Sequence, residues 1–94
     1  MKFVQTIEFK SQLIDEIRNI FEDYDQSAAI GFERSALCED RDQPGSYLAI
    51  VQFSSYEEAM QNSARPETDE MASRMGELVD GEVVYRNLDV LEER

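Results

Sequence analysis

The chain has 94 residues, of which 21 are acidic and 9 basic, and its formal net charge is −12. It contains no histidine and a single cysteine, Cys38. This composition excludes Ser-His-Asp and Cys-His catalysis, an imidazole general base, and a zinc site built on histidine or several cysteines. So much negative charge repels phosphate backbones and anionic lipids, so we expect neither nucleic acid nor a membrane as a partner.

The length predicts one domain that spans residues 1–94. A lone cysteine cannot close an intrachain disulfide, and no apolar run approaches the ~20 residues that a membrane span needs. The first residues are typical of a strand rather than of a signal peptide. We therefore expect a soluble, cytoplasmic protein.

The start of the chain predicts a strand, a helix and a loop. Residues 2–9 are rich in β-branched and aromatic side chains, which favours a strand. Ser11 is a candidate N-cap for the helix that follows, and residues 25–29 are expected to form a loop. The helix is predicted by apolar side chains at helical spacing, namely Leu13, Ile14, Ile17, Ile20, Phe21 and Tyr24.

The middle of the chain predicts a β-hairpin. Residues 30–39 form its first strand, residues 40–45 are dense in turn-forming residues, and residues 47–53 form its second strand. In the first strand Arg34 interrupts a set of apolar side chains that share one parity. These are Ile30, Phe32, Ala36 and Cys38.

The remainder predicts helices and a last strand. Ser55 and Glu58 have the spacing of a capping box, and Arg65-Pro66 interrupts the helix that they open. Pro66 suits the first position of a further helix, Asp80-Gly81 ends it, and residues 82–91 form a strand. The order β-α-β-β-α-β predicts an α+β, ferredoxin-like fold, with helices on one face of a four-stranded antiparallel sheet.

The predicted strands carry apolar side chains on both faces. In residues 47–53, Leu48 and Ile50 lie on one side, opposed by Ala49, Val51 and other apolar residues. Two helices cannot cover both faces, and a large exposed apolar face marks an interaction surface. The simplest arrangement packs two identical sheets face to face, so we expect a homodimer. Coverage of the second face by the strand ends and helix flanks of a monomer is the alternative.

Short motifs in the centre of the chain resemble those of one protein family. Gly31-Phe32 opens a strand, Pro44-Gly45-x-Tyr47 closes the hairpin, and Phe53-Ser54-Ser55 precedes Tyr56-Glu57-Glu58-Ala59. With the element order, these motifs resemble the antibiotic biosynthesis monooxygenase-like domain, a branch of the dimeric α/β-barrel superfamily. The resemblance covers nearly the whole chain. It implies a homodimer with a barrel-like core and a pocket between the sheet and the helices of each subunit.

The family includes cofactor-independent oxygenases that act on polycyclic aromatic substrates, and haem-degrading enzymes. Its members often have a tryptophan where this chain has Phe53, so an indole N–H that could orient a substrate oxygen is absent. Haem-degrading members bind iron through a histidine on the next helix, where this chain reads Met60-Gln61-Asn62-Ser63. We therefore expect no haem degradation by that route, no cofactor and no metal ion.

Six side chains are candidates for the substrate pocket, namely Arg34, Tyr47, Phe53, Asn62, Tyr85 and Arg86. Each arginine either donates to an anionic or carbonyl-bearing ligand, pairs with a nearby acid, or lays its stem along the surface with its charged head in water. The tyrosines either present hydroxyls to a ligand or pack in the core, and Asn62 either orients a substrate or caps its helix. Cys38 is expected to be a buried, inert thiol.

Two classes of function stay open. The missing tryptophan and histidine favour a non-catalytic homodimer that binds a small ligand or another protein. The resemblance implies the alternative, a cofactor-independent, monooxygenase-like enzyme whose aromatic substrate reacts with oxygen as its own carbanion. A sheet–helix pocket on the order of several hundred cubic ångströms with convergent polar groups supports ligand binding. A space filled by Phe, Met and Tyr side chains leaves only the interaction module.

Overall fold

The computed structural model describes residues 1–24 and 29–94. The elements along the chain are β1 (Phe3–Lys10), α1 (Ile14–Asp23), β2 (Phe32–Glu39), β3 (Ser46–Phe53), α2 (Tyr56–Ser63), α3 (Pro66–Gly76) and β4 (Val84–Asp89). This is the predicted order, with the second helical segment divided at Arg65. The predicted loop at residues 25–29 lies outside the described residues except for Ala29.

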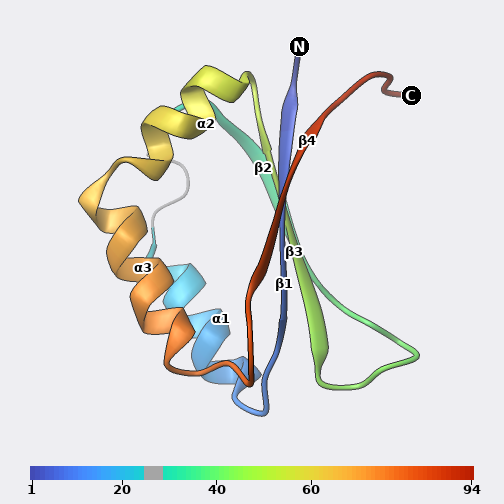
Figure 1. Cartoon of the computed structure of the whole chain (residues 1–94), viewed down its shortest axis with the longest axis vertical. Coiled ribbons are helices and arrows are strands. Elements are labelled where there is room, and N and C mark those ends of the chain that lie inside the picture. The colour runs from blue at the N-terminus through green and yellow to red at the C-terminus, as the bar shows by residue number, and fades with distance from the viewer. Residues whose placement is uncertain (25–28) are drawn as a thin grey trace.

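Four antiparallel strands form one sheet in the order β2-β3-β1-β4. All three helices lie on the same face of this sheet, and the two chain ends lie at one end of it (Figure 1). The α+β, ferredoxin-like prediction is therefore confirmed. The pairing of β1 with β3 places three pairs of buried side chains on the helix-facing side, Phe3–Phe53, Ile7–Ala49 and Phe9–Tyr47.

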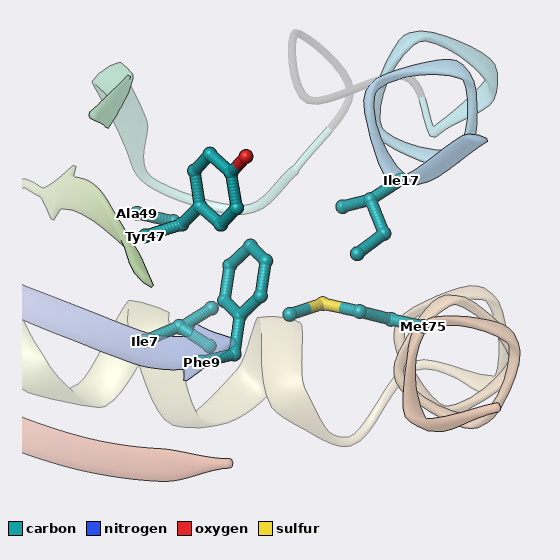
Figure 2. Packing of buried hydrophobic residues seen from close by; sticks show 6 residues of the cluster. All are labelled: Ile7, Phe9, Ile17, Tyr47, Ala49 and Met75. Carbon is teal, nitrogen blue, oxygen red and sulfur yellow. The ribbon is translucent and has the colours of Figure 1, made fainter. Parts of the chain in front are cut away.

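The main core lies where α1 and α3 meet the two central strands. Ile17 of α1 and Met75 of α3 point toward Phe9 of β1, and the three side chains belong to one buried cluster between the helices and the sheet (Figure 2). The rings of Phe9 and Tyr47 stack with their centroids 5.6 Å apart. Aromatic and sulfur-containing side chains therefore fill this part of the space between sheet and helices.

The sheet face turned away from the helices, here called the open face, is apolar on all four strands. The register places on it Val4, Ala36, Cys38, Leu48, Ile50, Val84 and Leu88. Val84 is 37% exposed and Leu88 44% exposed. The sheet is thus apolar on both faces, as the strand sequences predict, and only one of them is covered by helices (Figure 1).

Three local predictions need correction. Cys38 is exposed, because it faces away from the helices, so the prediction of a buried thiol is wrong. Leu13, not Ser11, is the N-cap residue of α1; the Ser11 hydroxyl accepts from Leu13 N and donates to Leu78 O. Phe32 does not share a face with Ala36, since an irregularity between Phe32 and Arg34 shifts the strand register.

The capping prediction at α2 is confirmed, because Ser55 Oγ accepts a hydrogen bond from Glu58 N at 3.2 Å. Among the helices in residues 1–24 and 29–94, none combines the length and the apolar character that crossing a membrane requires.

Gly31 and Gly45 provide a matched test of backbone packing. Both have positive φ angles, +72° and +90°, which cost an L-residue about 1–2 kcal/mol. A Cβ on Gly31 would lie 2.6 Å from the Cβ of Glu58, whereas one on Gly45 would meet nothing closer than 3.8 Å. Gly45→Ala is expected to lower the free energy of unfolding by about 1 kcal/mol and Gly31→Ala by about 3 kcal/mol. Urea unfolding measures both, and equal losses would contradict the steric argument.

Candidate functional site

A pocket of about 190 Å³ lies between α1 and the β2–β3 hairpin. We call it the α1–β2 pocket. Phe21 of α1 forms one wall, Leu37 of β2 faces it, and Ala49 and Val51 of β3 form the floor. The pocket exists because α1 packs against α3 and sends Ile17 toward the central strands, while β2 lies at the edge of the sheet. Leu37 is accordingly 36% exposed.

The rim of the α1–β2 pocket is polar. Arg18 and Glu22 lie one helical turn apart on α1, so they share one side of the helix, and Ser35 of β2 lies across from them. A second hollow of about 420 Å³ adjoins the pocket, and Arg18 and Leu37 line both spaces. The other residues of this hollow are Ile14, Cys38, Glu39 and Tyr47. An apolar floor with a charged rim suits a small ligand that has one polar edge.

The six sequence-predicted site residues lie in separate regions, and none of them lines the α1–β2 pocket. Tyr47 and Phe53 are buried in the two core clusters, and Tyr47 also borders the adjoining hollow. Tyr85 is half exposed on the edge strand β4. Arg34 and Arg86 lie on the open face, where the register pairs them with Gln52 and Thr6.

Asn62 is buried in the helical layer, where it joins α1, α2 and α3. Its Oδ1 accepts hydrogen bonds from the Tyr24 hydroxyl at 3.4 Å and from Arg65 Nη1 at 3.1 Å. Its backbone carbonyl accepts one from the Thr68 hydroxyl at 2.8 Å. A cavity of about 320 Å³ lies beside this network, and its two arginines already pair with acids, Arg65 with Glu67 and Arg74 with Asp23.

The two open-face arginines also have protein partners. Arg86 pairs with Glu8 at 3.1 Å, and Arg34 lies 3.8 Å from Glu93. Arg34 Nη2 also donates to Gln52 Oε1 at 3.4 Å. The ion-pair alternative that the sequence left open is the arrangement that the structure shows for both side chains.

The pKa values of the Glu33 carboxyl and the Tyr47 phenol are both shifted, each for a clear physical cause. The Gln52 amide, which donates to Glu33 at 2.8 Å, lowers the pKa of Glu33, and Lys2 lowers it further. Burial raises the pKa of Tyr47, and the charge of Glu39 adds to this shift. Tyr47 is therefore a protonated core residue at neutral pH. Within residues 1–24 and 29–94, no group of three or more His, Cys, Asp or Glu side chains is arranged to hold a metal ion.

The pocket-lining residues Arg18 and Leu37 were not among the sequence candidates. Arg18 follows Ile14 by four residues and precedes Phe21 by three, so it lies beside the apolar stripe of α1 rather than opposite to it. That spacing was the available signal. The pocket itself depends on the distance between α1 and β2, which the local sequence does not encode.

The chain is similar in structure to several solved proteins. A variant of SnoaB, a cofactor-independent oxygenase from Streptomyces nogalater, matches with a TM-score of 0.85 and 18% identity over 98% of this chain and 95% of that one. Rv0793 from Mycobacterium tuberculosis gives 0.83 and 18%, over 99% and 98% of the two chains. A proposed antibiotic biosynthesis monooxygenase from Caulobacter crescentus gives 0.84 and 18%, over 97% and 91%.

The chain has the fold of the antibiotic biosynthesis monooxygenase-like domain. The resemblance stated on the sequence motifs is thereby confirmed at the level of the fold. No protein-family model matches the chain, and no curated protein matches it.

The Glu33–Gln52 hydrogen bond predicts a pH effect. A carboxyl whose pKa is lowered by folding stabilises the folded state above its unfolded pKa, and this contribution disappears as the pH falls through the lowered value. Gln52→Ala is expected to move the pKa of Glu33 back toward 4.5, its ordinary value. A carboxyl-detected NMR titration measures this shift, with the exposed Gln12→Ala as the matched control. An unchanged Glu33 titration in Gln52→Ala would contradict the assignment.

Proposed function

We propose that this chain is a cytoplasmic homodimer that binds a small, largely apolar ring compound in the α1–β2 pocket of each subunit, without catalysis. The observation that carries the proposal is the pocket itself. Its floor and walls are formed by Phe21, Leu37, Ala49 and Val51, and its polar groups are confined to the rim.

The volume of the pocket sets the size of the ligand. An apolar cavity of about 150 Å³ is large enough to hold benzene. At about 190 Å³, the α1–β2 pocket has room for one aromatic ring with a small substituent. On the side of the central strands, Phe9, Tyr47 and Met75 pack in one buried cluster, so we expect the ligand not to extend toward the centre of the sheet (Figure 2).

The open face supports the homodimer. It carries apolar side chains at adjacent positions of all four strands. Of its charged side chains, Arg86 pairs with Glu8 and Arg34 lies 3.8 Å from Glu93. A second copy of the same surface would bury these side chains through a two-fold axis. Burial of Val84, Leu88 and Cys38 in that way would also explain why apolar residues and a thiol are exposed in a single subunit.

Cofactor-independent oxygenation is a second candidate function. It is favoured by the likeness to SnoaB, which is described as a cofactor-independent oxygenase. In that case the bound aromatic compound would supply the electrons, and the apolar pocket would shield it from water. Oxygen uptake by the protein with a bound electron-rich phenol would distinguish this function from binding alone.

Phenol is a suitable first probe for the proposed binding. Leu37→Trp places a larger side chain at the pocket wall and is expected to weaken phenol binding about tenfold or more, since the ring then lacks space. Leu13→Trp is the matched control, because Leu13 is similarly exposed but lies outside the pocket. Isothermal titration calorimetry measures both affinities. Phenol binding that is absent from the wild type, or equal in the two variants, would overturn the proposal.

The homodimer has its own test. Ile50 lies in the middle of the open face, between Thr6 and Ala36. Ile50→Glu is expected to convert the dimer to a monomer. Each subunit would bury one unpaired carboxylate in the apolar interface, and burial of an unpaired charge is costly. Leu13→Glu makes the same kind of change at the N-cap of α1, away from the open face, and should leave the dimer intact. Native mass spectrometry measures the oligomeric state of the wild type and of both variants. A monomeric wild type would contradict the proposal.

A further inference from the structure

We infer that Arg18 determines ligand size, because its side chain forms a neck that limits the α1–β2 pocket to a ligand with one ring. The inference rests on the proposed ligand binding at this pocket. It assigns to Arg18 a role in specificity.

The neck is defined by the lining of the two neighbouring spaces. The α1–β2 pocket has a volume of about 190 Å³ and the adjoining hollow about 420 Å³. Among the residues that the structure describes, Arg18 from α1 and Leu37 from β2 line both. They come from opposite walls, and this placement is the basis for inferring a neck between a small space that suits one ring and a larger space beyond it.

The floor continues beneath the neck. On β3, Val51 and Ala49 lie under the pocket and Tyr47 borders the hollow, and these alternate residues point to the same face. The distance along the strand from Tyr47 to Val51 is four residue steps, about 13 Å. A fused two-ring compound would fit along this floor if the neck were open.

The side chain of Arg18 is not held by other groups. Within residues 1–24 and 29–94, the structure gives Arg18 no hydrogen bond and no ion pair, in contrast to Arg74 and Arg86, which pair with Asp23 and Glu8. Its aliphatic stem can therefore lie along the pocket while the guanidinium stays in water. The obstruction is thus the bulk of the stem, and its removal breaks no interaction of the fold.

Two substitutions at Arg18 separate the effect of side-chain size from that of charge. Arg18→Ala removes both the stem and the charge, whereas Arg18→Met keeps a flexible stem and removes only the charge. If the stem forms the neck, Arg18→Ala opens the pocket into the hollow and Arg18→Met does not. Leu37→Ala widens the same neck from the β2 side and provides an independent variant.

The experiment measures the dissociation constants of phenol and 1-naphthol by isothermal titration calorimetry. The wild type and Arg18→Met are expected to bind phenol and to bind 1-naphthol about tenfold or more weakly. Arg18→Ala and Leu37→Ala are expected to bind 1-naphthol about tenfold or more tightly than the wild type does. Phenol affinity should stay within about threefold in Arg18→Ala. Arg41→Ala, in the exposed hairpin turn, is the matched control and should change neither value.

Three results would overturn the inference. The first is a wild type that binds 1-naphthol as tightly as phenol, and the second is an Arg18→Ala variant with unchanged 1-naphthol affinity. The third is an Arg18→Met variant that behaves as Arg18→Ala does, since the charge would then set the selectivity. A wild type that binds neither probe would contradict the proposed function and, with it, this inference. The three results above contradict the inference alone, so the two failures are distinguishable.

Discussion

The register between β1 and β3 is the constraint on which the rest of the molecule depends. It aligns Phe3, Ile7 and Phe9 with Phe53, Ala49 and Tyr47, so that one continuous apolar surface faces the helices. Because side chains alternate along a strand, a shift of one residue would turn this surface toward the other face. Ile17 and Met75 would then lose Phe9 as their packing partner (Figure 2). The helical layer therefore has a fixed place only because these two strands do.

The candidate pocket is a consequence of where that helical layer ends. α1 packs against the central strands through Ile17 and also contacts α3. The edge strand β2 is therefore only partly covered by helices. The irregularity between Phe32 and Arg34 adds to this effect. Phe32 remains packed beside Phe3 and Phe53, while Ser35 and Leu37 line the space under α1. The same edge strand thus closes the core at one end and leaves a pocket at the other.

The sequence predicted the elements and their order, because periodicity and turn residues are local signals. The helical spacing of apolar residues that include Ile17 and Ile20 predicted α1, and Ser55 predicted the start of α2. Properties that depend on packing between elements were less accessible. Cys38 was expected to be buried because parity alone does not tell which face the helices cover. The pocket candidates were scattered for the same reason, since Asn62 and Tyr47 are both buried but serve the helical layer and the core.

The distribution of charge also bears on how the subunits would associate. Two copies that each carry a net charge of −12 repel one another in most orientations. The first turns of α1, α2 and α3 concentrate acids, which favour helix N-termini but add to this repulsion. On the open face, by contrast, Arg86 pairs with Glu8, and Arg34 lies 3.8 Å from Glu93. An approach through this face brings paired charges and apolar side chains together and keeps the acidic helices far apart. The acidity of the helical layer would therefore direct association to the sheet.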